Sequence, residues 1–351
     1  MTRQLALLVI VAGCGRLHFD GLFDNAFIVT TPQDRLAGPP TAASLDDLDP
    51  GLTDLSLREA LTIAANTPGS DLVTFDRDVF PSGSPATIAL ASELPALVSA
   101  HTVVDARDAG VIIDVAEPYA GPLVRVSGTA CELRGIRFLR SSGAITASGL
   151  DITISDNRIE GVAGDPILAQ ASSNLTIERN TIVIGDKTSG RGVRLEGVTG
   201  SRVRDNVIDP GPAQLVSLFD SSDNEISGNI LDGGNIGVLL DGASLRNRIF
   251  RNVVIAPSEE PIVILDTVTG TVILNNTFFQ CLSGTSNSAA DTVETNTLQA
   301  DTGFADPASY DFHITSAQGI DQGTDVGQDM LPDRTERFLG AAPDLGAVET
   351  R

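Results

Sequence analysis

Between Ile152 and Phe278, one short pattern of apolar and polar positions returns six times. In each copy an asparagine has an apolar residue three positions before it and another two positions after it, as in I-S-D-N-R-I. The asparagines are Asn157, Asn180, Asn206, Asn229, Asn252 and Asn276. Their spacings of 23, 26, 23, 23 and 24 residues are typical of a solenoid.

A second apolar pair lies upstream of most of these asparagines, with one residue between its members. Examples are Val193 with Leu195, Val216 with Leu218, Val238 with Leu240, and Val263 with Leu265. This period of two indicates short strands, and the Gly, Asp, Asn and Ser between them supply turns. One coil cannot bury its own apolar positions, so coils must stack. Because parallel crossovers are right-handed, the pattern predicts an all-β, right-handed parallel β-helix.

Each asparagine lies between two strands, where the chain must bend. Asparagine tolerates the left-handed conformation, and its amide can bond to the equivalent amides one coil above and below. We therefore expect the six asparagines to form a structural ladder and not a catalytic group. An earlier coil is visible at Leu133 to Phe138, with Ile136 in the asparagine position.

A short amphipathic helix is predicted before the repeats. Ser56 and Glu59 have the spacing of a capping box, and Pro68-Gly69 ends the segment. The apolar stripe of this helix consists of Leu57, Ala60, Leu61 and Ala64. Such a helix can cover the exposed first coil of a solenoid.

The pattern divides the chain into five parts. We expect a signal peptide at 1–13, a tether at 14–50, a cap with the first strands at 51–115, the β-helix repeats at 116–298 and a C-terminal cap region at 299–351.

The net charge of −23, with Lys187 as the single lysine, argues against binding nucleic acid, which needs a dense cationic surface. The absence of tryptophan and the presence of only two tyrosines leave few aromatic platforms for sugar rings.

The N-terminus has the features of an export signal: a basic start, an apolar run from Leu5 to Ala12, and then a small residue. The sequence V-A-G-C ending at Cys14 resembles a bacterial lipobox, which implies cleavage before Cys14 and lipidation of its thiol. Gly15 after the cysteine implies the outer membrane in a diderm source. A plain secretory signal or a misassigned start codon is the alternative. Cys131 and Cys281 lie about six coils apart, so we expect two free thiols.

The segment L-S-L-R-E-A from Leu55, together with Gly69–Asp76 and Thr87–Leu97, resembles the CSLREA motif of bacterial surface β-helix proteins. Leu55 stands where that family usually has cysteine. Asp306–Ile314 and Pro343–Glu349 are similar to a less complete copy of its terminal pattern. The resemblance implies this fold and a location at the cell surface, and the family has no single established activity.

Parallel β-helices include pectate lyases, polygalacturonases and uronate epimerases, so we looked for their residues. The polygalacturonase motifs N-T-D and G-H-G are missing, and His18, His101 and His313 all lie outside the repeats. The sequence thus excludes that hydrolase chemistry, and we assign no catalytic residue.

Lyase chemistry needs a cation beside a uronate carboxyl group. Arg137 and Arg158 occupy the same outward position on successive coils, near Asp156 and Glu160. The candidate anion- or glycan-binding residues are Arg134, Arg137, Arg158, Arg179 and Arg194. The alternative is a solvated face on which these arginines pair with neighbouring carboxylates.

Asp241 and Asp266 follow strands in equivalent positions, with Glu196 on an earlier coil. Such an acidic column could hold Ca²⁺, or it could be the polar outer face of the strands. We predict no other metal site and no other cofactor.

These observations predict an exported, lipid-anchored, monomeric cell-surface β-helix. Its expected role is non-enzymatic binding or adhesion to a polysaccharide or a surface protein. One alternative is a polysaccharide lyase or uronate epimerase acting on acidic glycans, and another is a passive structural component of the envelope.

Overall fold

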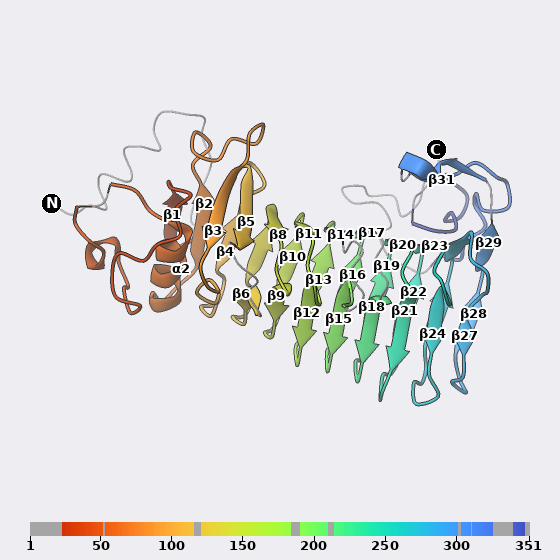
Figure 1. The fold of residues 1–351 in the computed structure, drawn as a ribbon. Coiled ribbons are helices and arrows are strands. Elements are labelled where there is room, and N and C mark those ends of the chain that lie inside the picture. The colour runs from red at the N-terminus through yellow and green to blue at the C-terminus, as the bar shows by residue number, and fades with distance from the viewer. Residues whose placement is uncertain are drawn as a thin grey trace.

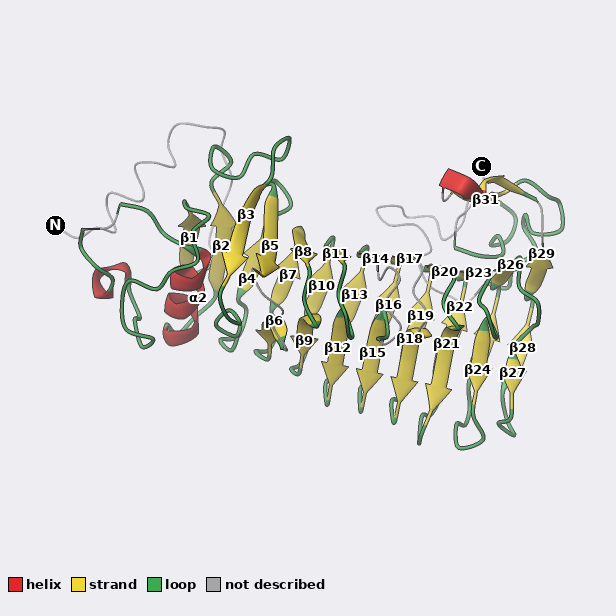
Figure 2. Cartoon of the chain, in the orientation of Figure 1, coloured by secondary structure: helices red, strands yellow, loops and turns green. Residues whose placement is uncertain are grey.

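The computed structural model describes residues 23–51, 53–115, 121–183, 190–209, 214–300, 303–309, 311–325 and 340–347. In this part of the chain, three parallel sheets run along a single elongated solenoid (Figures 1 and 2). We name them sheets A, B and C, in the order in which the chain visits them within a coil. The predicted parallel β-helix is thereby confirmed.

Sheet A has 11 strands among the described residues: β1 (Asn25–Val29), β2 (Asp71–Phe75), β4 (Val103–Asp105), β7 (Glu132–Arg134), β10 (Thr153–Ser155), β13 (Thr176–Glu178), β16 (Arg202–Arg204), β19 (Glu225–Ser227), β22 (Arg248–Phe250), β25 (Val272–Leu274) and β28 (Val293–Thr295). Sheet B has 10 there: β3 (Ala86–Leu90), β5 (Val111–Val115), β8 (Ile136–Leu139), β11 (Arg158–Glu160), β14 (Thr181–Val183), β17 (Val207–Asp209), β20 (Ile230–Asp232), β23 (Val253–Ile255), β26 (Thr277–Phe279) and β29 (Leu298–Ala300). Sheet C has 8 in the same ranges: β6 (Pro122–Val126), β9 (Gly143–Ala147), β12 (Ile167–Gln170), β15 (Val193–Glu196), β18 (Gln214–Phe219), β21 (Ile236–Asp241), β24 (Ile262–Ile264) and β27 (Ser286–Asn287).

The asparagine ladder lies in the turn between sheets A and B, as predicted. Nδ2 of Asn157 donates to Oδ1 of Asn180 at 3.1 Å, and the same bond continues coil by coil to Asn276. Each amide also donates to a backbone carbonyl of the preceding coil, for example from Asn229 to Val203 at 2.8 Å. These side chains are buried, so the bonds satisfy amide groups that would otherwise destabilise the fold.

The residue in the left-handed conformation is the one before each asparagine, and the expectation that the asparagine itself adopts it is wrong. The backbone φ is +79° at Gly135, +58° at Asp156, +52° at Arg179 and +55° at Asp205. The ladder asparagines are not among the described residues with positive φ, and their buried side chains point inward to reach their neighbours in the ladder. The bend therefore comes from the residue before each asparagine, which is Gly135, Asp156, Arg179 or Asp205 on the earlier coils.

The inward positions of sheet C follow the predicted alternation, with one correction. The ladder pairs Val238 with Ile262, so Ile262 and Ile264 face the core and Val263 faces outward. The expected inward pair Val263 with Leu265 is therefore out by one residue. The loop between β23 and β24 sets this register, and a shift of one residue exchanges the two faces of a strand.

The N-terminal cap is built on helix α2 (Leu57–Asn66), which has the predicted capping box between Ser56 and Glu59. The preceding residues from Asp24 to Pro50 are also folded, so the tether expected at 14–50 does not include them, and residues 14–22 lie outside the described residues. Strand β1 pairs with β2 in the first coil, and Arg35 forms ion pairs with Asp54 and Glu59. A short 3₁₀ helix, η2 (Leu45–Asp47), completes this region.

At the other end, an antiparallel hairpin covers the outer face of sheet B (Figure 1). It consists of β30 (Phe304–Asp306) and β31 (Asp311–Ile314), joined through the 3₁₀ helix η3 (Pro307–Ser309). Phe304 and Phe312 pack edge to face with Phe279 of β26, with ring centroids 5.2 and 5.9 Å away.

The last coil places polar residues at positions that are apolar in earlier coils. Asn287 is paired with Ile264, Glu294 with Ile273, and Gln299 with Phe278. A polar layer of this kind ends the core and discourages another strand from adding to the open edge.

Cys131 and Cys281 are both buried and are not bonded to each other, as predicted. Cys14, the expected lipidation site, lies outside the described residues. None of the described helices has the length and apolar character needed to cross a membrane.

Candidate binding site on sheet C

The five arginines predicted to form an anion site do not lie on one face. Arg134 is on sheet A, Arg137 and Arg158 are on sheet B, Arg179 is in the turn between these sheets, and Arg194 is on sheet C. Only the stacked pair Arg137 and Arg158 is brought together as expected.

The arginines of sheet B and the adjoining turn are neutralised by carboxylates. Glu160 accepts from both Arg137 and Arg158, at 2.5 and 2.6 Å, and Arg179 pairs with Asp156 at 2.8 Å. Partial burial raises the pKa of Glu160, but hydrogen bonds from Arg158 and Arg137 outweigh it, and the pKa lies below its usual value. This face therefore matches the alternative expectation of paired, solvated charges.

The predicted acidic column on sheet C is not a cluster. Glu196 pairs in the ladder with Phe219, and Phe219 pairs with Asp241, so an aromatic ring separates the two carboxylates. Asp266 lies one residue beyond the position opposite Asp241, because the strand before it is shifted. Over the described ranges, no three His, Cys, Asp or Glu side chains are close enough to hold a metal ion.

Sheet C instead carries a mixed group of charged side chains centred on β15. Nη1 of Arg194 donates to Oδ2 of Asp165 at 3.1 Å, and the same guanidinium pairs with Glu196. The other oxygen of Glu196 accepts from Nε2 of Gln170 at 2.9 Å. Asp165 also accepts the backbone N–H of Arg191 at 2.8 Å, which fixes the chain where it enters β15.

Arg191 differs from the other arginines near it. Its Nε donates to Oε1 of Gln214 at 2.7 Å, which is a neutral partner on the next coil. No carboxylate among the described residues forms an ion pair with its guanidinium, which is partly exposed. The charge of Arg191 is thus available to an anionic ligand.

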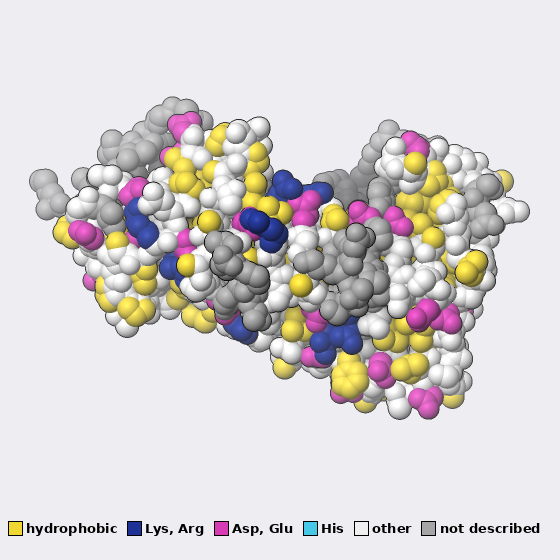
Figure 3. All heavy atoms as spheres, viewed as in Figure 1, with side chains coloured by type: hydrophobic (Ala, Val, Ile, Leu, Met, Phe, Trp, Pro, Cys, Tyr) yellow, Lys and Arg dark blue, Asp and Glu magenta, His cyan; other side chains and the backbone are white. Residues whose placement is uncertain are grey.

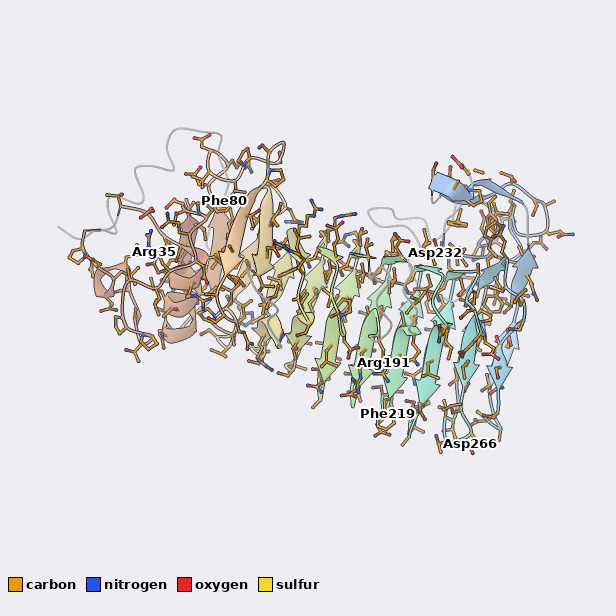
Figure 4. The ribbon with its side chains drawn as sticks, in the orientation of Figure 1. Arg35, Phe80, Arg191, Phe219, Asp232 and Asp266 are labelled. Carbon is orange, nitrogen blue, oxygen red and sulfur yellow. The ribbon has the colours of Figure 1, made fainter. Side chains whose placement is uncertain are left out.

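Phe219 gives this face an exposed aromatic ring. It is the last residue of β18 and is 46% exposed. Its ring lies against Gly242, where a Cβ atom would be 3.1 Å from Cε2 of Phe219. Figure 4 labels Arg191 and Phe219 on the lower flank of the solenoid, and Figure 3 shows dark-blue basic side chains beside an apolar group there.

We call this group the sheet C site. Its members are Asp165, Gln170, Arg191, Arg194, Glu196, Gln214 and Phe219. The sequence interpretation identified only Arg194 and Glu196. Phe219 could have been identified from the sequence. It comes directly after the inward pair Val216 and Leu218, so it is an apolar residue at an outward position. No feature of the sequence identified Arg191, since its neutral partner depends on how two coils align.

Comparisons with known proteins agree with this architecture. Residues 123–297 match the family model described as a right-handed β-helix region. Pectate lyase Pel9A superposes with a TM-score of 0.55 and 14% identity, over 93% of this chain and 96% of that one. An alginate lyase from Paenibacillus sp. str. FPU-7 gives 0.42 and 11%, over 78% and 99%. A periplasmic alginate epimerase gives 0.40 and 13%, over 67% and 68%.

No curated protein matches the chain by sequence. At 14% identity, the similarity to pectate lyase Pel9A shows the fold alone. The described part of the chain is a right-handed parallel β-helix, and about half of its length is similar to the family model of that region.

Proposed function

We propose that the protein binds an acidic polysaccharide at the sheet C site and acts on it as a lyase or an epimerase. The observation that carries this proposal is the guanidinium of Arg191, which is held by the neutral Gln214 and paired with no described carboxylate. The similarity in fold to a pectate lyase over nearly the whole of both chains supports the same class of substrate. This reading replaces the expected adhesion role as the first candidate.

Arg191 would bind the carboxylate of a uronate residue. Two parallel N–H···O bonds between a guanidinium and a carboxylate are short, strong and directional. The positive charge withdraws electron density from the carboxylate and so lowers the pKa of the C–H group beside it. Lyases and epimerases both begin by removing that C5 proton.

Glu196 is the group that we propose accepts the proton. It faces outward from β15, and Arg194 and Asp165 connect its carboxylate to the backbone N–H of Arg191. In elimination, the C–H electron pair forms the C4–C5 double bond, the C4–O bond breaks, and the leaving oxygen takes a proton. In epimerisation, a proton returns to C5 from the opposite face. Asp165 and Gln214 act as positioning residues.

Binding without turnover is the second candidate. Arg194 contacts both Asp165 and Glu196, and an arginine beside a carboxylate makes that carboxylate a weaker base. If these pairs persist with ligand bound, the site would hold a glycan without reacting with it.

The test is incubation of residues 15–351 with alginate, polygalacturonate and uronate-containing heteropolysaccharides. Unsaturated products would be followed by ultraviolet absorbance and mass spectrometry, and epimerised residues by NMR. We expect product from the wild type and none from Glu196→Gln, which retains binding. Binding without product from the wild type would support the second candidate, and neither binding nor product would refute both.

We also propose that the protein is exported and anchored to the bacterial envelope by a lipid on Cys14, with the outer membrane as its location. The support is the sequence pattern of residues 1–15. Metabolic labelling with a fatty acid should mark the wild type and not Cys14→Ser. Label on both proteins, or on neither, would contradict the proposal.

A further inference from the structure

The N-terminal end of sheet A contains a carboxylate that is completely buried and incompletely bonded. Asp71 is the first residue of β2 and is 0% exposed. Its Oδ1 accepts from Nδ2 of Asn25 at 2.8 Å, whereas its Oδ2 accepts no hydrogen bond from any described residue. Thr67 lies beside this carboxylate, but its hydroxyl donates to the Ile63 carbonyl at 2.9 Å. One buried acceptor is therefore left for a partner from outside the chain.

The surroundings of Asp71 do not balance its negative charge. Removal from water raises the pKa of Asp71, the hydrogen bonds that it accepts offset this only in part, and the charge of the nearby Asp24 raises the pKa further. The described arginines that precede β2, Arg35 and Arg58, pair with other carboxylates. A buried carboxylate is stable in its charged form when it is paired or coordinates a metal ion.

A surface cavity of about 360 Å³ lies next to Asp71, where helix α2 ends (Figure 1). Its wall includes Asp24 and Thr67, both of which interact with Asp71. Ser70 donates its backbone N–H and its hydroxyl to Oδ2 of Asp24, at 2.8 and 3.1 Å, which orients that carboxylate. Gly69 leaves the same oxygen accessible, since its φ is +112° and a Cβ atom there would lie 2.5 Å from it.

We propose that this cavity binds a divalent cation of the calcium type between Asp24 and Asp71. The two carboxylates and the Thr67 hydroxyl are oxygen ligands, and the cavity has room for water molecules to complete a shell of about six to eight oxygens. The carbonyl end of α2 also favours positive charge at this place. The cation would join β1 and the residues before it to the first coil.

The sequence indicated no metal site here, because Asp24 and Asp71 are far apart in the chain. They become neighbours only when β1 pairs with β2, which aligns Asn25 with Asp71. The site is separate from the sheet C site, so its loss leaves the proposed function standing.

The experiment is isothermal titration calorimetry of residues 15–351 with calcium chloride, in an excess of potassium chloride. We expect the wild type to bind Ca²⁺ at this site. Asp71→Asn keeps an acceptor for Asn25 and removes the charge, so it should weaken binding about tenfold or more, and so should Asp24→Asn. The matched control is Asp46→Asn in the exposed helix η2, outside the cavity wall, which should bind like the wild type.

Thermal unfolding gives a second readout. Ca²⁺ should raise the unfolding midpoint of the wild type and of Asp46→Asn, and leave that of Asp24→Asn unchanged. If Asp71→Asn does not fold, Asp24→Asn decides the result, because its side chain is at the surface. Absence of Ca²⁺ binding by the wild type, or binding that Asp24→Asn leaves unchanged, would overturn the proposal. Equal losses in Asp24→Asn and Asp46→Asn would also overturn it, since they would indicate general attraction to an acidic protein.

Discussion

Nε of Arg191 donates to Oε1 of Gln214 on the next coil at 2.7 Å, and this bond orients the guanidinium without cancelling its charge. The five arginines predicted from the sequence all have carboxylate partners. A neutral partner therefore distinguishes Arg191 from the other arginines described on this surface and makes it suited to an external anion.

Arg191→Gln should weaken binding of a uronate oligosaccharide by about 10- to 100-fold, because a hydrogen bond to a charged group contributes about 1.5–3 kcal/mol. Titration calorimetry measures the change. The matched control is Arg202→Gln on sheet A, another exposed arginine without a described ion pair, which should bind like the wild type. Equal losses in the two variants would indicate nonspecific charge attraction.

Asn206→Ala should lower the free energy of unfolding by about 3 kcal/mol or more, since it leaves several buried groups unpaired. The Asn206 amide donates to Asn229 and to the Ile177 carbonyl, and its oxygen accepts from Asn180. Urea denaturation measures the loss. Asn235→Ala, in a partly exposed loop, should change it by less than about 0.5 kcal/mol. A similarly small effect at Asn206 would show that the ladder does not hold the coils together.

The repeat made most of the fold predictable, because the same inward-facing apolar positions recur at every coil. Asn157 to Asn276 and the apolar residues around them recur at the same positions of each coil, so the period determines the sheets and the ladder, whereas the cap helix was predicted from its own capping box. The prediction was wrong at Val263, where a loop changes the register of one strand. At residues 24–50, a composition rich in Pro, Thr and Asp suggested a tether, although strand β1 there pairs with β2.

The candidate site was largely not predictable, because it depends on neighbours across coils. Arg137 and Arg158 are equivalent in sequence and do stack, but the sequence does not show that one carboxylate, Glu160, neutralises both. Arg191 lies outside the repeated phrase, and its isolation from carboxylates follows from the alignment of its loop with Gln214.

Gly135→Ala should destabilise the protein more than Gly161→Ala. Both glycines have positive φ, at +79° and +65°, so alanine costs about 1 kcal/mol at either. At Gly135 the added Cβ would also lie 2.3 Å from the backbone N of Arg107, whereas at Gly161 the nearest atom is 4.0 Å away. We expect a further loss of about 1–3 kcal/mol at Gly135 in urea denaturation. Equal effects would mean that the close approach of the two coils relaxes freely.

Acid should weaken the paired face of sheet B. The folded-state pKa of Glu160 is lowered from its ordinary value of 4.5, so the stabilisation is present above pH 4.5 and is lost as the pH falls through the folded-state pKa. Thermal unfolding between neutral and acidic pH should therefore show a steeper decline for the wild type than for Glu160→Gln. Parallel curves for the two proteins would show that the arginine pairs at Glu160 contribute nothing to this dependence.

The most direct test of the central claim is a crystal structure of Glu196→Gln with a bound uronate-containing oligosaccharide. We predict that the glycan lies on the outer face of sheet C, with a uronate carboxylate within hydrogen-bond distance of the Arg191 guanidinium and a sugar ring over Phe219. A glycan bound instead at Arg137 and Arg158 on sheet B, or on sheet A, would contradict the assignment of the site.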